Sequence, residues 1–227
     1  MDVLRLFRED VEFLGVRGVK RSVGEEKGYA SATAHGPESP GESGAARDAR
    51  LGAAVERARR GDEEAFSEVY RIVHPGLLGY LRGIVGEDAE DVASDAWLET
   101  ARDLGRFRGD GAGFRAWTAT IARHRALDHL RRVRSRPRPA PFEQDLAELP
   151  ATGDAAGEAL DALSTERALA LIAGLPRDQA EAVLLRVVVG LDGPSAARVL
   201  GKRPGAVRSA AHRGLNRLAK QLKERGR

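Results

Sequence analysis

Toward the C-terminus, the chain carries side chains suited to reading DNA. The last expected helix, from Gly205 to about Leu222, has one apolar face. Its other faces carry Arg208, Ser209, His212, Arg213 and Asn216. Such side chains can hydrogen bond to base edges and phosphates when the N-terminal half of a helix lies in the major groove. A short turn, Gly201-Lys202-Arg203, precedes it. The pattern indicates a helix-turn-helix, with a solvated basic helix as the alternative.

A second basic segment lies near the middle of the chain. Residues 121–138 contain seven Arg and one acid, Asp128. Phosphates attract arginine, and aromatic rings close to such a cluster can receive the unstacked bases of single-stranded DNA. The nearby aromatics are Trp97, Phe107, Phe114 and Trp117. The alternative is core packing, which we expect for Trp97 and Trp117 because aromatics make up only 5% of the chain.

An acidic segment precedes these arginines. Residues 87–103 contain seven Asp or Glu and one base, Arg102. Such a run is usually a solvated helix face. Here it adjoins two segments that favour nucleic acid, and DNA would repel it, so it fits a basic protein partner better.

Several kinds of chemistry are excluded. The chain has no Cys, so disulfides, thiolate metal sites and a cysteine nucleophile are absent, and a reducing compartment, the cytoplasm, is expected. Gly109, Gly111 and Gly113 lack the spacing of a phosphate-binding loop, and His124 and His129 do not share a helix face. We expect no enzyme activity, no cofactor and no metal. Neither an export signal nor a membrane-spanning segment is visible.

Composition and apolar spacing predict an all-α protein of two small helical domains. In the first, Asp62 is the expected N-cap of a helix that runs to Val73, and Pro75-Gly76 interrupts the pattern. Further helices are expected over residues 77–86, 89–104 and 114–136. In the second, they are expected over residues 168–175, 180–188, 195–200 and 205–222.

The domain boundaries follow from composition. Residues 1–50 form an N-terminal extension that we expect to be largely disordered, in which Val3–Val16 is a short docking helix or forms only transiently. Residues 51–136 form the first domain, 137–158 a flexible Pro- and Gly-containing linker, and 159–227 the second domain.

Taken together, these segments resemble a bacterial RNA polymerase sigma factor of the extracytoplasmic-function (ECF) class, which retains sigma regions 2 and 4. The region 2 motifs are Asp62-Glu63-Glu64-Ala65-Phe66, Asp88-Ala89-Glu90-Asp91-Val92, Phe107-Arg108-Gly109-Asp110 and Ala126-Leu127-Asp128-His129-Leu130-Arg131-Arg132. The region 4 motifs are Leu175-Pro176, Val183-Leu184-Leu185-Arg186 and Gly205-Ala206-Val207-Arg208-Ser209. Both regions are similar and stand in the family's order.

The resemblance implies partners and roles. The partners are core RNA polymerase, through the clamp helices of its largest subunit and the flap, and promoter DNA; an anti-sigma factor is a further candidate. Core polymerase would bind Asp88, Glu90, Asp91, Asp95 and Glu99. The melted minus-10 strand would contact Phe107, Arg108, Trp117, Arg123, His124, Arg125, Asp128, Arg131 and Arg132. The minus-35 duplex would contact Lys202, Arg203, Arg208, Ser209, His212 and Arg213.

The main hypothesis is therefore a sigma factor that directs promoter-specific initiation and stabilises the melted strand. The rival hypothesis is a stand-alone helix-turn-helix regulator, and a weaker one is an interaction protein whose basic faces bind an acidic partner. The acidic segment separates the first two, because a stand-alone regulator has no need of a polymerase-docking face.

Overall fold

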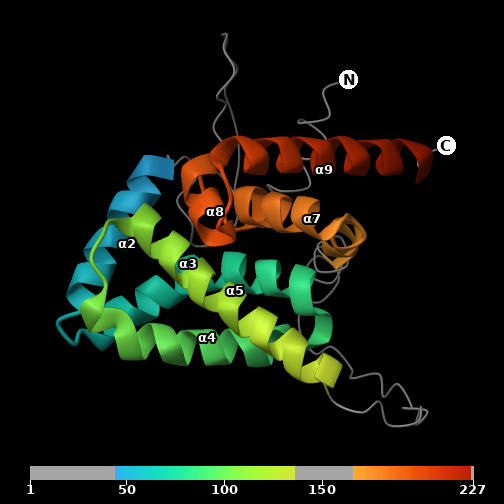
Figure 1. Ribbon diagram of the computed structural model, residues 1–227. Helices are drawn as coiled ribbons and strands as arrows, with labels where there is room; N and C mark the ends of the chain where they lie inside the picture. The colour runs from blue at the N-terminus through green and yellow to red at the C-terminus, as the bar shows by residue number, and fades with distance from the viewer. Residues whose placement is uncertain (1–43, 136–165, 226–227) are drawn as a thin grey trace, which may run out of the picture.

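The computed structural model describes residues 44–135 and 166–225 (Figure 1). Within these ranges all regular structure is helical, so the all-α expectation is confirmed. The expected linker at residues 137–158 and the expected helix Val3–Val16 lie outside the described residues. None of the described helices is both long and apolar enough to cross a membrane.

Four long helices and two short 3₁₀ turns make up the first domain. They are α2 (Gly44–Ala58), α3 (Glu63–Val85), η1 (Gly86–Asp88), α4 (Ala89–Asp103), η2 (Leu104–Arg106) and α5 (Gly111–Ser135). Asp62 caps α3 as expected, because its carboxylate accepts a 2.9 Å hydrogen bond from the Ala65 amide. In Figure 1, α3 and α5 lie between α4 on one side and the second domain on the other.

The expected break at Pro75-Gly76 is wrong. α3 continues through Pro75, which stands inside the helix. Proline removes one backbone hydrogen bond and usually kinks a helix. Here the buried residues on both sides of it, Val69, Val73, Leu77 and Leu81, fall on one helical face, and burying that face holds the helix together.

The first domain contains a helix, α2, that the sequence pattern did not indicate, and α5 begins earlier than expected. Ordered structure is described from Gly44 rather than Leu51, because α2 needs the preceding turns to bury Leu51 and to place Asp48 against Arg115 of α5. α5 begins at Gly111, three residues before the expected start at residue 114. The Asp110 carboxylate accepts a 2.7 Å hydrogen bond from the Gly113 amide, so it provides the helix start.

The second domain begins with a helix over residues 166–173 and continues with α7 (Arg177–Val183), the π-helical η3 (Leu184–Val188), α8 (Gly193–Leu200) and α9 (Pro204–Arg225). The expected helix-turn-helix is present as α8 and α9. Gly201, which ends α8, has φ 62°, a left-handed conformation that glycine adopts at little cost. Asp192 caps α8 through a 2.7 Å hydrogen bond from the Ser195 amide.

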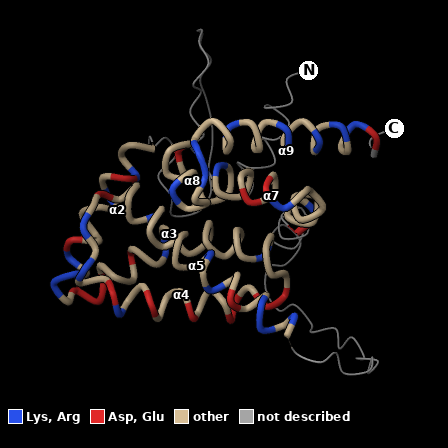
Figure 2. Tube along the Cα trace, viewed as in Figure 1, with Lys and Arg blue, Asp and Glu red and all other residues tan. Residues whose placement is uncertain are grey.

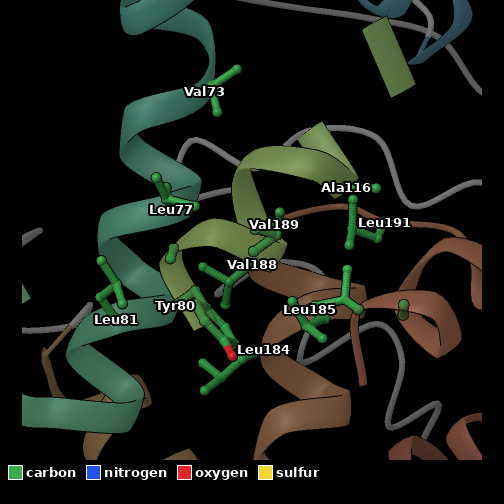
Figure 3. Close-up of a cluster of buried hydrophobic side chains, with 14 of the residues drawn as sticks. Val73, Leu77, Tyr80, Leu81, Ala116, Leu184, Leu185, Val188, Val189 and Leu191 are labelled. Carbon is green, nitrogen blue, oxygen red and sulfur yellow. The ribbon is translucent and has the colours of Figure 1, made fainter. Parts of the chain in front are cut away.

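The two domains pack directly against each other. α3 and α5 contact α7, η3 and α8, and one continuous apolar core extends across both domains. Figure 3 shows part of this core, where Tyr80 and Leu77 of α3 face Leu184 and Val188 of η3. Leu77, Tyr80 and Leu184 are at most 1% exposed, so this contact is as well packed as a domain interior.

Candidate nucleic-acid interface and docking faces

Basic residues cover the outer surface of α9. All six candidates for duplex contact are exposed: Lys202, Arg203, Arg208, Ser209, His212 and Arg213. Their helix is held against α7 and α8 by its buried face, which includes Val207, Ala210 and Leu218. The structure therefore places a rigid basic helix at the surface, with a turn at Gly201 that aligns Lys202 and Arg203 beside its first turn.

Little within the described residues competes for these cations. Arg213 lies 3.9 Å from the Asp178 carboxylate, at the limit of an ion pair, and both side chains are about half exposed. Asn216 and His212 are joined by a 3.1 Å hydrogen bond along the helix. Exposed pairs of this kind are worth little in water. The α9 surface is thus available to a polyanion without rearrangement.

The acidic face of α4 lies on the opposite side of the molecule. Figure 2 shows acidic residues along α4 and basic residues along α9, separated by the rest of the helices. Asp91 and Asp95 are exposed, one turn apart, and lie at the centre of the acidic face together with Leu98, which is 66% exposed. No ion pair to either aspartate occurs within residues 44–135 and 166–225.

The remaining three candidate acids lie at the edges of this face and are paired inside the domain. Glu90 accepts a 3.0 Å hydrogen bond from Arg82 of α3. Asp88 lies 2.9 Å from His129 Nε2, and Glu99 accepts a 2.6 Å bond from Arg125, both on α5. Asp91 and Asp95 are therefore the two candidates to which no cation among the described residues is paired.

The candidate strand-binding residues of α5 separate into an exposed centre and two occupied edges. His124, Asp128 and Arg131 share one exposed face, on which Asp128 accepts a 2.8 Å bond from Arg131, and Arg132 is exposed beside them. Because neighbouring helical residues point about 100° apart, Arg123 and Arg125 flank His124 on opposite sides. Each of these two arginines is paired with a carboxylate.

On one edge, Arg125 Nε donates to Glu99 of α4 over 2.6 Å. On the other, Arg123 Nε donates to Glu181 of α7, in the second domain, over 2.9 Å. The Glu181 side chain is only 6% exposed and also accepts a 2.9 Å bond from Arg177. Two candidate DNA contacts are thus bound to the chain's own acids.

The aromatic candidates lie largely in the core. Phe107 is 8% exposed, and its ring centroid lies 5.2 Å from that of Phe114, edge to face, and 5.1 Å from that of Trp117. Trp117 is half-buried and is the more exposed of the two candidates. Arg108 folds back onto the backbone through 2.8 and 2.7 Å bonds to the carbonyls of Gly105 and Phe107, which fixes the loop before α5.

Trp97 packs in the core, as expected from the scarcity of aromatic residues in the chain. It is 7% exposed, its centroid lies 4.8 Å from that of Tyr70, and its Nε1 donates a 3.2 Å bond to His74 Nδ1. Burial lowers the pKa of His74, the Glu90 carboxylate opposes this, and Arg82 adds to it. Because indole N–H can only donate, the bonded His74 nitrogen is an acceptor and the ring is neutral.

Sequence reasoning missed Glu181. A signal was available, because Glu181 follows Arg177 by four residues and lies in the segment Ala180–Val188, in which Arg186 is the one other charged residue. A charged residue at such a position is almost never fully buried unless it is paired. What the sequence did not indicate is that its second partner, Arg123, comes from the other domain.

Comparison with family models gives two matches in the expected order. The model described as Sigma-70 region 2 matches residues 69–136, and the model described as Sigma-70, region 4 matches residues 165–218. The first match covers α4 and α5 with most of α3, and the second covers α8 and most of α9.

Curated relatives cover most of the chain. The ECF RNA polymerase sigma factor SigD of Mycobacterium tuberculosis is 36% identical over 179 residues, which is 76% of this chain and 84% of SigD. The ECF RNA polymerase sigma factor ShbA of Streptomyces griseus is 35% identical and covers 74% of this chain and 93% of its own length.

Solved structures share the fold. CnrH, in complex with the cytosolic domain of CnrY, aligns with a TM-score of 0.55 and 23% identity over 77% of this chain and 98% of CnrH. The sigma factor RpoE of Bartonella quintana, in complex with the anti-sigma factor NepR, aligns with a TM-score of 0.52 and 24% identity over 70% of this chain and 96% of that chain.

Proposed function

The chain belongs to the ECF class of RNA polymerase sigma factors, and from this membership we propose which of its faces performs each part of promoter-specific transcription initiation. The protein acts with core RNA polymerase and promoter DNA as a regulator of initiation. RNA synthesis remains with the core enzyme, so this chain carries out no catalysis of its own and needs no cofactor. Its place of action is the cytoplasm.

Core polymerase docks on the acidic face of α4. Asp91 and Asp95 carry most of this contact, because they are exposed and form no ion pair with a cation in the part of the chain that the structure describes. A basic surface on the clamp helices of the largest polymerase subunit would complement them, and complementary charge speeds association and fixes orientation. Asp88, Glu90 and Glu99 form the edges of the face, and their partners there hold α4 against α3 and α5.

The melted minus-10 strand lies along α5. His124, Arg131 and Arg132 are exposed for phosphate or base contacts, and Trp117 offers a partly open ring for stacking. Binding energy from captured bases offsets the cost of unstacking them, so strand separation needs no nucleotide hydrolysis. Arg123 and Arg125 join this surface once they exchange their internal carboxylate partners for phosphates.

The minus-35 duplex is read by α9. Arg208, Ser209, His212 and Arg213 lie on its exposed N-terminal half, where a recognition helix meets base edges in the major groove. Lys202 and Arg203, in the turn before the helix, are placed for the phosphate backbone.

The observation that carries this assignment is the separation of charge between α4 and α9. A stand-alone helix-turn-helix regulator would account for the basic face of α9 and leave the exposed acids of α4 without a role. The region 2 match, which includes α4, favours the sigma factor for the same reason.

The test is charge reversal at the centre of the acidic face. In Asp91→Lys/Asp95→Lys, we expect at least a hundredfold loss of affinity for core polymerase, roughly what like-charge contacts at an interface cost. Binding of duplex promoter DNA should stay unchanged. The matched control is Glu63→Lys/Glu64→Lys, which reverses two exposed acids on α3.

Polymerase binding is measured by fluorescence anisotropy of labelled protein with sigma-free core enzyme, and DNA binding by gel shift. Unchanged polymerase affinity in the α4 variant would contradict docking at Asp91 and Asp95. Equal losses in both variants would show that total charge, rather than this face, controls binding.

An anti-sigma factor is a further proposed partner. The solved complexes concern other sigma factors, one with NepR and one with a CnrY domain. For this chain, co-purification from its native host with an antibody to the chain would identify such a partner, and the recovery of polymerase alone would argue against it.

A further inference from the structure

The contact between the two domains is built from features that have no role in the assignments above. Gly76 and Gly83 of α3, seven residues apart, face η3 with Gly79 between them. A Cβ atom on Gly79 would come within 2.8 Å of Val188 Cγ1, and one on Gly83 within 2.6 Å of Leu184 Cδ1. Because these glycines have no Cβ atom, η3 packs closer to the backbone of α3 than it could if other residues stood at these positions.

Tyr80 lies within the same contact. Its side chain is fully buried, and its hydroxyl has no hydrogen-bond partner among the described residues. Burial, and secondarily the charge of Glu181, raise the pKa of this phenol far above its usual range. A buried hydroxyl without a partner costs free energy while the domains are in contact, and it would regain water if they separated.

Glu181 joins the domains electrostatically. Its carboxylate, 6% exposed, accepts 2.9 Å bonds from Arg177 of its own helix and from Arg123 of α5. A buried carboxylate that loses its single cationic partner pays a large desolvation cost. A carboxylate with two arginine partners can lose one of them and keep its bond to the other. Glu181 can therefore release Arg123 and remain paired with Arg177.

From these contacts we infer that Glu181 competes with the promoter strand for Arg123. In the closed chain, in which α7 and η3 pack against α3 and α5, Glu181 binds Arg123 as a phosphate would. The strand gains Arg123 only when α7 and η3 separate from α3 and α5. This inference rests on the proposed strand-binding role of α5. The duplex-reading face of α9 and the docking face of α4 stay exposed in the closed chain. Closure thus withholds Arg123 from the strand surface and leaves the docking face and the duplex-reading face available.

The test measures closure first, without DNA or polymerase. Because the chain has no Cys, dyes can be attached only at Arg102→Cys on α4 and Lys220→Cys on α9, both exposed positions in different domains. In this background, Glu181→Gln and, independently, Gly79→Leu should replace a single inter-dye distance with a longer, broader distribution. The controls are Glu166→Gln, the same change at an exposed site, and Gly193→Ala, where a Cβ would meet nothing within 4 Å.

The second measurement is affinity for a short fluorescent single-stranded DNA. If about one molecule in ten is open, full opening should tighten binding about tenfold. Glu181→Gln should show this gain, and Arg123→Gln/Glu181→Gln should lose most of it. Affinity for a promoter duplex should not change in Glu181→Gln, because the α9 face is exposed in both forms.

Three results would overturn the inference. They are a broad inter-dye distance already in the unmodified chain, an unchanged distance in both Glu181→Gln and Gly79→Leu, and opening without tighter strand binding. Failure of the proposed function has a different signature, namely loss of polymerase docking or promoter use while the distances behave as described.

Discussion

α5 and α9 both present arginines to solution, but they do so in different states. On α9 the candidate DNA contacts are exposed, and among the described residues their one ion pair is the 3.9 Å contact of Arg213 with Asp178. On α5, Arg123, Arg125 and Arg131 each bond to a carboxylate at 2.9 Å or less. The duplex surface is ready as folded, whereas Arg123 and Arg125 of the strand surface must exchange partners before they can bind.

This difference matches the order in which the two forms of DNA exist. A duplex element is present before any melting, so a preformed surface can find it by charge attraction. A melted strand appears only after the protein is already docked. Arginines that are paired internally until then bind stray polyanions less strongly, because every phosphate contact first requires the loss of an ion pair.

The largest expected effect is on α9. Arg208→Ala/Arg213→Ala should weaken duplex promoter binding about a hundredfold, since each base or phosphate contact by arginine is worth about 1–3 kcal/mol. The salt dependence should also become shallower by about two counterions. Binding is measured by anisotropy over a range of salt concentrations, with Lys223→Ala, an exposed cation at the far end of α9, as the control.

If Arg208→Ala/Arg213→Ala lost less duplex affinity than Lys223→Ala, α9 would not be the helix that reads the duplex. Affinity for single-stranded DNA provides the contrast between the helices. It should fall little in the α9 variant, because α5 carries that contact.

A smaller effect is expected at the other paired edge of α5. Glu99→Gln removes the charge that holds Arg125, and single-strand affinity should rise about two- to threefold, in line with the small worth of ion pairs between partly exposed groups. The Arg125 and Glu99 side chains are 36% and 29% exposed, whereas Glu181 is 6% exposed, so the gain should be less than in Glu181→Gln.

The measurement is titration of labelled single-stranded DNA, with Glu63→Gln on α3 as the matched control. Equal gains in Glu99→Gln and Glu181→Gln would mean that general charge, and not release of a particular arginine, sets strand affinity. If neither variant bound single-stranded DNA more tightly, the contrast between α5 and α9 would have no functional meaning.

The sequence was most informative where local signals agree. Asp62 and Gly201 mark helix ends through capping and backbone conformation, which need only neighbouring residues, and Pro194 stands in the first turn of α8. The helix-turn-helix could therefore be drawn almost to the residue. The sign of charge along α4, α5 and α9 could likewise be read directly, since charged side chains remain near the surface.

What could not be predicted depends on packing between distant segments. Pro75 was expected to end a helix by its local chemistry, but the buried stripe from Val69 to Leu81 outweighs it. Glu181 was overlooked because its partner Arg123 lies 58 residues away in the sequence. The candidate list for α5 could name the arginines but could not separate the exposed centre of the helix from its occupied edges.

The smallest expected effect concerns the contact beneath the docking face. His74 of α3 accepts a hydrogen bond from Trp97 of α4 and stacks on Tyr70 at 4.4 Å, with Arg82 and Glu90 nearby. Burial holds its pKa below the usual 6.5, so the unfolded chain binds a proton more readily than the folded one. Stability from this group is complete above about pH 6.5 and declines as the pH falls through that value toward the folded-state pKa.

Chemical denaturation followed by tryptophan fluorescence at pH 7.5 and 5.5 measures this decline. His74→Phe keeps a ring against Tyr70 and cannot be protonated, so part of the loss of stability at pH 5.5 should disappear in this variant. Because the contact joins α3 to α4, acid should weaken polymerase docking before it affects duplex binding by α9. If His74→Phe kept the full pH dependence of the unmodified chain, the effect would belong to the surface carboxylates. Equal acid sensitivity of polymerase docking and duplex binding would show that the two faces respond as one unit.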